Sequence, residues 1–283
     1  MIRDLRITVL AENTAGRRDL LAEHGLAWWI EADGYRVLFD TGQGMVLEHN
    51  ARALGFELEE ARAVVLSHGH YDHTGGLGGA LACFRNAAVF AHPLAFTPKY
   101  ACGGGSARSV GSPFHDLAEL ELAVAAVQPT RTPVAICPGV WATGEIPRAN
   151  DFEDTGGAFF LDEHCSTPDP LLDDQAVYLE SPQGIVVLLG CAHAGLVNTL
   201  DYVASLTGRD RIHAVLGGMH LVSASYERIA RTETALQHYD VQVIGPAHCT
   251  GRKATTQLWQ EFPGRCVECV AGSSFRFSAD RGP

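Results

Sequence analysis

The chain has 283 residues, 46% of them hydrophobic, so it can bury a large core as one sizeable domain or as two fused halves. Its formal net charge of −12 would repel a phosphate backbone over most of the surface. This charge argues against a nucleic-acid partner, whereas a small anionic substrate remains possible.

The sequence carries no signal for a membrane. No apolar run reaches membrane-spanning length, and the start at Met1 lacks the basic and then apolar pattern of a signal peptide. We therefore expect a cytoplasmic protein whose eight cysteines are mostly reduced. Cys266 and Cys269 form an isolated C-x-x-C pair, which we interpret as core packing because no second pair completes a tetrahedral site.

The first predicted elements are strands. Leu5 to Leu10 alternates in the manner of an edge strand. The runs from Ala27 to Ile30 and from Tyr35 to Phe39 flank an Asp-Gly pair at 33–34, which predicts a hairpin. Its second arm ends at Asp40, whose carboxylate could either orient a metal-ligating histidine or cap a turn.

A buried strand at 63–66 leads directly into the most distinctive stretch of the chain, His68-Gly-His70-Tyr-Asp72-His73. Three imidazoles and one carboxylate are ligands for zinc, iron or manganese, and loops at the carboxyl ends of strands in α/β sheets are frequent ligand sites. His68 and His70 can face one ion, while Asp72 and His73, beyond a bend, can face a second. The motif therefore predicts a metal site.

Helices and strands alternate around this motif. The stretch from Met45 to Leu54 is amphipathic and closes at a glycine, and a second helix is expected from Gly76 to Phe84. The strand from Ala88 to Ala91 then ends at His92. This rhythm is typical of one α/β half.

Residues 97–116 interrupt the rhythm with a glycine-rich segment, which we interpret as a solvated loop or a mobile lid. In a lid, Lys99, Arg108 and His115 would meet an anionic substrate. Short antiparallel strands are predicted at 121–127 and 134–143.

The predicted strand at 134–143 is followed by a turn that carries Glu145 and Arg148. An exposed ion pair between these residues or a contact with substrate would explain them equally well.

The second half repeats the plan of the first. A hairpin at 176–180 and 185–189 is followed by a helix to Leu206, a strand at 212–216, a helix at 223–238 and a strand at 241–244. Strands of this half end in polar tips that carry Cys191, His193, His220 and His248. Two such halves, about 1–145 and 146–283, would bring the tips of both to one seam.

Most of the other histidines need no special role. His24, His49, His164, His213 and His238 lack partners at ligand spacing, so we interpret them as structural or surface residues.

The HxHxDH pattern resembles the metallo-β-lactamase superfamily. The resemblance implies a single α/β domain folded as a four-layer αββα sandwich that holds one or two metal ions. His248 matches the final ligand of the superfamily, and Cys191 stands where a bridging aspartate is usual; a thiolate is a competent zinc ligand there. The histidine expected between these and the motif is not apparent. Glu145 or His193 could replace it, and we favour His193.

A wider set of motifs resembles one branch of that superfamily, which includes the dihydropterin aminobenzene phosphate synthases. These motifs surround Asp40, the HxHxDH loop, Glu145, Cys191, His220 and His248. The resemblance implies that Glu145, Arg148, His193 and His220 lie around a substrate pocket.

The leading hypothesis is a hydrolase with two divalent ions, most simply zinc. A metal-activated hydroxide would attack an ester, lactone or phosphoryl substrate that is small and anionic. Asp72 would be both a ligand and a proton acceptor, and His220 an acid for the leaving group. Three alternatives stay open: a synthase that displaces diphosphate from a pterin, a non-catalytic ligand-binding protein on the same fold, and an iron-dependent redox enzyme. The sequence does not define an oligomeric state.

Overall fold

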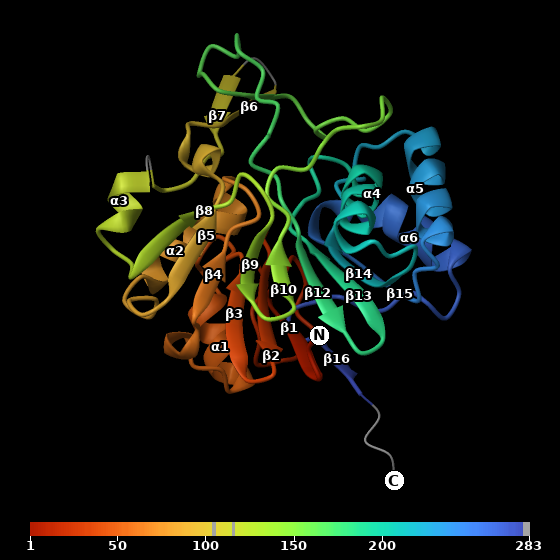
Figure 1. Ribbon diagram of the computed structural model, residues 1–283. Helices are drawn as coiled ribbons and strands as arrows, with labels where there is room; N and C mark the ends of the chain where they lie inside the picture. Colours follow the sequence, from red (N-terminus) through yellow and green to blue (C-terminus); the bar gives the residue numbers. More distant parts are fainter. Residues whose placement is uncertain (104–105, 115–116, 280–283) are drawn as a thin grey trace.

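Two β-sheets pack face to face in the computed structural model, and helices cover the outer face of each sheet (Figure 1). The structure describes residues 1–103, 106–114 and 117–279. Buried side chains form three clusters: one lies between the sheets, and one lies under each helical layer. The predicted four-layer αββα sandwich is therefore confirmed.

The first sheet has seven strands and contains the predicted hairpin. Asp33 and Gly34 both adopt positive φ angles, 48° and 87°, as a tight two-residue hairpin turn requires. The order is β16 (Ser274–Ser278), β1 (Asp4–Ala11), β2 (Ala27–Ala32), β3 (Tyr35–Phe39), β4 (Ala63–Val65), β5 (Ala88–Ala91) and β8 (Ala126–Pro129).

Helices α1, α2 and α3 lie on the outer face of this sheet, next to the short 3-10 turns η1 and η2 (Figure 1). Their apolar side chains pack onto β3, β4 and β5. The bounds are α1 (Leu47–Leu54), η1 (Leu58–Glu60), α2 (Tyr71–Ala80), η2 (Pro93–Phe96) and α3 (Leu117–Glu121).

The second sheet has six strands, and its strands β13 and β14 are buried along most of their length because they are covered on both faces. The order is β15 (Val243–Ala247), β14 (Ile212–Gly218), β13 (Gly184–Leu189), β12 (Val177–Ser181), β10 (Val140–Ala142) and β9 (Val134–Cys137). Its outer layer consists of α4 (Leu196–Thr207), α5 (Tyr226–His238) and α6 (Arg252–Glu261), with the 3-10 turn η3 (His248–Thr250) after β15.

Two strand predictions need correction. β1 is not an edge strand, because β16 returns from the end of the chain and pairs with it. The expected strand at 121–127 is replaced by the end of α3 and by β8, which pairs with β5 in parallel. The β9–β10 hairpin belongs to the second sheet, and the division of the chain into halves near residue 145 stays a prediction.

Within its described residues, the glycine-rich insert forms two β-strands, although we interpreted it as a solvated loop or a mobile lid. β6 (Tyr100–Gly103) pairs with β7 (Ser106–Ser109) and with β11 (Phe159–Phe160), and we call these three strands the flap. Figure 1 shows it standing above the sandwich. His115, predicted to belong to a lid, lies outside the described residues.

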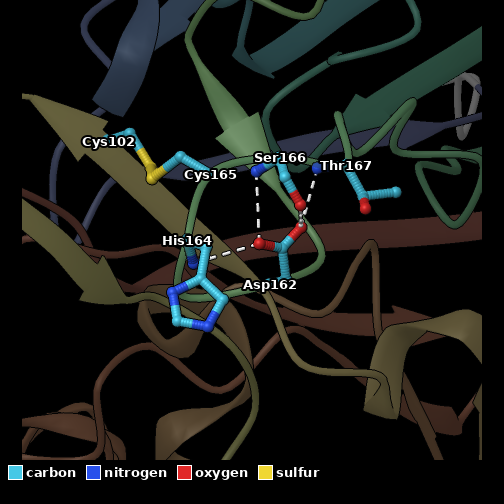
Figure 2. Close-up of a disulfide and its surroundings, with 6 residues drawn as sticks. All are labelled: Cys102, Asp162, His164, Cys165, Ser166 and Thr167. Carbon is cyan, nitrogen blue, oxygen red and sulfur yellow. Dashed lines mark hydrogen bonds between the residues drawn. A yellow bond between two sulfur atoms is a disulfide. The ribbon is translucent and has the colours of Figure 1, made fainter.

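A disulfide between Cys102 and Cys165 ties the flap to the loop that follows β11 (Figure 2). In that loop, the Asp162 carboxylate accepts hydrogen bonds from the backbone amides of His164, Ser166 and Thr167. Six cysteines are free, so most are reduced as expected, with one bridged pair as the exception.

Cys266 and Cys269 are both buried in the interior. Cys266 packs under the outer helices of the second sheet, and Cys269 packs between the two sheets. Across the described residues, every helix is too short or too polar to cross a bilayer.

The disulfide leads to a prediction for stability. Replacing Cys102 with serine removes a cross-link that spans 63 residues, so the free energy of unfolding should fall by up to about 4 kcal/mol from the loop-closure entropy. Urea denaturation of the oxidised protein and of Cys102→Ser would measure the difference. Cys83→Ser, at a free and partly exposed thiol, is the control. Equal stability of Cys102→Ser and the oxidised wild type would contradict the prediction.

Candidate metal centre

Strand ends from both sheets converge on one seam. The HxHxDH loop follows β4 in the first sheet. The ends of β13, β14 and β15 in the second sheet carry Cys191 and His193, His220, and His248, respectively. Parallel neighbouring strands end at the same edge of a sheet, which explains why residues far apart in sequence meet here. The convergence predicted from the two halves is therefore present.

The first of two ligand groups consists of His68, His70 and His193. All three are buried, and their candidate ligand atoms lie within 4.8 Å of one another. Two of their nitrogens, Nε2 of His70 and Nε2 of His193, are buried without a hydrogen-bond partner. A buried polar atom without a partner is costly, and a metal ion in this group would satisfy Nε2 of His193. His70 presents Nδ1 to the group, because this nitrogen lies 2.9 Å from Nε2 of His68.

Protonation of this group favours metal binding. Nδ1 of His193 donates to the carbonyl oxygen of Thr155 at 2.7 Å, so its Nε2 carries no proton in the neutral ring. Burial lowers the pKa of His70 to about 3 and holds the pKa of His68 and of His193 well below the usual range. All three rings are therefore neutral at pH 7, as ligands must be.

The second group consists of Asp72, His73 and His248. Oδ2 of Asp72 lies 3.3 Å from Nε2 of His248 and 3.9 Å from Nε2 of His73, and the two Nε2 atoms are 3.3 Å apart. Ligands about 2.0–2.1 Å from a tetrahedral zinc ion are separated by about 3.3 Å, so these spacings fit such an ion. Sγ of Cys191 lies 3.1 Å from Nε2 of His73, on the side of the first group.

Asp40 holds the motif loop in place. Its Oδ1 accepts a hydrogen bond from the amide of Ser67 at 2.7 Å. Its Oδ2 accepts from the Ser67 hydroxyl at 2.7 Å and from Nδ1 of His73 at 2.6 Å. Of the two roles considered for Asp40, the structure shows the orienting one: the carboxylate directs Nε2 of His73 toward Cys191 and His248.

The second sheet closes tightly onto this contact through Gly190. A side chain at Gly190 would place its Cβ 2.1 Å from the Ser67 hydroxyl and 3.1 Å from Oδ2 of Asp40. Only glycine lets the tip of β13 approach so closely. Backbone strain accumulates at the same seam, because Asp40, Ala192, His220 and His248 all have positive φ angles.

Sequence reasoning missed His24. Its Nε2 lies 3.2 Å from Oδ2 of Asp72, and its ring centroid is 4.9 Å from that of His248. His24 therefore contacts the second ligand group, although we interpreted it as a structural or surface residue. It stands alone on a loop between β1 and β2, so ligand spacing could not reveal it. Nδ1 of His248 is held in turn by Oδ1 of Asn13 at 2.9 Å.

A cavity of about 1100 Å³ opens over both groups. Phe159 from the flap covers one side, with its ring centroid 4.7 Å from that of His70, and Arg108 from β7 contributes a positive charge. His220 also lines the cavity, and its ring centroid is 4.3 Å from that of His193. Trp259 of α6 lies among the other lining residues.

Three residues predicted to contact substrate do not line this cavity. Lys99 is fully buried and pairs with Asp169 and Asp173, each at 2.9 Å, so the prediction that it meets substrate from a lid is wrong. Glu145 and Arg148 are not among the described residues that line the cavity. Glu145 lies 3.9 Å from His92, and Arg148 donates to the carbonyl oxygen of Pro170. Their role in substrate binding stays a prediction.

Comparison with known proteins defines the class. The family model of the metallo-beta-lactamase superfamily matches residues 21–214, more than half of the chain. The chain therefore belongs to the metallo-β-lactamase superfamily, as its fold and strand-tip ligand groups indicate.

Three individual proteins are similar to the chain over most of its length. The 7,8-dihydropterin-6-methyl-4-(beta-D-ribofuranosyl)-aminobenzene-5'-phosphate synthase of Methanocaldococcus jannaschii is 29% identical, and the match covers 98% of each chain. An uncharacterized protein of the same organism is 33% identical over 90% of this chain and 94% of its own. Among solved structures, Tm1679, a metal-dependent hydrolase of the β-lactamase superfamily, has a TM-score of 0.83 and 30% identity, covering 97% of this chain and 100% of its own. The predicted resemblance to the superfamily and to its synthase branch is confirmed.

The position of Asp40 generates a prediction for metal affinity. An asparagine there would present an amide nitrogen or a neutral oxygen where the Asp40 carboxylate now accepts from Nδ1 of His73, so the imidazole should lose its fixed orientation. We expect Asp40→Asn to weaken zinc binding about 10–100-fold, as measured by competition with a chelating dye. Asp19→Asn, an exposed carboxylate paired with Arg17, should leave the affinity unchanged. Wild-type affinity in Asp40→Asn would refute the orienting role.

Proposed function

We propose that the protein is a metal-dependent hydrolase that acts on a small anionic substrate with an ester, lactone or phosphoryl centre. The observation that carries the proposal is the placement of two adjacent ligand groups beside an open cavity that members of both groups line. Kinship with a superfamily that includes the metal-dependent hydrolase Tm1679 supports it.

We propose two metal positions. His68, His70 and His193 would hold one divalent ion, and Asp72, His73 and His248 would hold the second, with the Cys191 thiolate between them. Imidazole, carboxylate and thiolate together favour zinc, although iron and manganese accept most of these ligands. Divalent ions of this kind supply Lewis acidity and lower the pKa of water from 15.7 to about 7.

The residues around these positions would provide the remaining chemistry. Burial alone would raise the pKa of Asp72, but the surrounding imidazoles, His73 foremost, hold it well below the usual range, so the carboxylate is ionised as a metal ligand must be. The same carboxylate would be the proton acceptor. His220 faces the cavity with a buried Nδ1 that has no partner, and it would donate a proton to the leaving group.

The flap would complete the pocket above the metal positions. Phe159 covers the imidazoles of the first group, which would limit the access of bulk water. The Arg108 guanidinium lies at the wall of the cavity and would attract an anionic group. The net charge of −12 agrees with a small substrate rather than a nucleic acid.

A second candidate function is a synthase that displaces diphosphate from a pterin. It is favoured by the full-length similarity to the dihydropterin aminobenzene phosphate synthase of Methanocaldococcus jannaschii, which the shorter matches to N-acyl homoserine lactonases do not equal. The same two ligand groups would then assist the cleavage of the bond between a pterin carbon and the diphosphate oxygen. The cavity would hold the pterin and the acceptor at once.

The hydrolase proposal predicts that His70→Ala loses more than about tenfold of the zinc-dependent turnover of a panel of lactones, aryl esters and phosphodiesters. The reason is the loss of one imidazole from the first ligand group. His164→Ala is the matched control, because its side chain is 82% exposed and lies outside both ligand groups. Unchanged turnover in His70→Ala, with an unaltered circular dichroism spectrum, would sink the proposal.

The two candidates differ in product. Incubation with a dihydropterin diphosphate and an aminobenzoate acceptor should release diphosphate and form a carbon–nitrogen or carbon–carbon adduct only if the protein is a synthase. Mass spectrometry of the products separates this result from simple hydrolysis. Wild-type protein that binds fewer than two metal ions and converts none of these compounds would instead indicate a non-catalytic ligand-binding protein.

A further inference from the structure

A second thiol lies beside Cys191. Cys249 directly follows His248 in η3, and the candidate ligand atoms of Cys191, His248 and Cys249 all lie within 4.8 Å of one another. The Cys249 thiol donates to the carbonyl oxygen of Cys191 at a distance of 3.6 Å. The two sulfur atoms therefore come from the ends of different strands, β13 and β15, and face the same part of the seam.

The strand between them leaves room for this arrangement. β14 separates β13 from β15, and a side chain at its last residue, Gly218, would place its Cβ 2.7 Å from Sγ of Cys249. With glycine there, the thiol can turn inward across the end of β14. Cys249 also lines the cavity, so both a metal ion and solvent can reach it.

The neighbouring imidazoles extend the same cluster. The ligand atoms of Cys191, His193 and His220 form another group within 4.8 Å, and Nδ1 of His220 is buried without a partner. Soft sulfur donors with an adjacent imidazole are the ligand set that selects zinc over manganese or magnesium.

The remaining free cysteines provide a contrast. Cys137 and Cys269 pack between the sheets, and Cys266 packs under the outer helices. Cys83 lies on the far side of the first sheet, where its thiol donates to Glu59. Within the described part of the chain, Cys249 is the one thiol besides Cys191 that belongs to a possible ligand group.

We propose that Cys249 is a metal ligand, which gives the centre a second thiolate next to Cys191 and makes the position near His248 sulfur-rich and selective for thiophilic divalent ions. On binding, the Cys249 thiol releases its proton to solvent, and the thiolate forms a bond to the ion. This inference rests on the proposed function only in requiring that the centre binds a divalent ion.

Cobalt(II) tests the proposal, because each cobalt–thiolate bond adds to the ligand-to-metal charge-transfer absorption. In metal-free protein reloaded with cobalt, we expect Cys249→Ser to lose about half of the charge-transfer intensity and to bind cobalt at least about tenfold more weakly. Cys191→Ser should lose a similar share, and Cys83→Ser should match the wild type. Full intensity in Cys249→Ser would overturn the proposal.

A second measurement uses the wild-type protein alone and decides the question even if Cys249→Ser fails to fold. Iodoacetamide should alkylate Cys249 in the metal-free protein and should fail to do so after zinc is added, as peptide mass spectrometry would show. Equal labelling of Cys249 with and without bound zinc would overturn the proposal and leave the proposed function intact. Wild-type protein that binds neither cobalt nor zinc would overturn both.

Discussion

The carboxylate of Asp40 is the contact on which the metal centre depends. It is fully buried, and it accepts hydrogen bonds from the Ser67 amide, the Ser67 hydroxyl and Nδ1 of His73. A buried carboxylate is stable only when its oxygens are satisfied, so the end of β3 and the motif loop must keep their relative positions. Gly190 then brings the second sheet onto the same contact, so one buried side chain lies where both halves of the sandwich meet.

The two ligand groups differ in charge because their surroundings differ. The first ligand group is neutral because burial lowers the pKa of its imidazoles, whereas the second contains an ionised Asp72 among imidazoles. Two positions of unequal charge lie side by side, a suitable arrangement for two divalent ions with different tasks. The thiols of Cys191 and Cys249 lie between and beside these groups and distinguish this centre from one built only of nitrogen and oxygen ligands.

The sequence predicted the structural features that depend on residues close together in the chain. The motif loop after β4, the Asp-Gly hairpin and the polar tips of β13 to β15 are visible in the sequence, because apolar strands and turn residues have short-range signatures. Pairing between distant segments has none, so the return of β16 to β1 was missed. The burial of Lys99 was missed for the same reason, since its partners Asp169 and Asp173 lie 70 and 74 residues away. His193 was favoured for the missing ligand because it shares a strand tip with Cys191; His24, alone on its loop, offered no such clue.

The buried ion cluster of Lys99 has a consequence for how this protein can evolve. Asp173 pairs with Lys99 through Oδ1, and through Oδ2 it accepts a hydrogen bond from the amide of Gly69 at 2.8 Å, between two histidines of the motif. The base of the flap is thus fastened to the metal loop, while every residue of β7 is exposed. Substitutions in β7 would change the exposed rim of the cavity, but the residues that directly follow this strand, Val110 and Gly111, pair with Tyr71 and His70 of the motif loop. The flap is therefore joined to the ligand loop on both sides of its hairpin, and sequence changes at its rim are constrained by the geometry of the ligand groups.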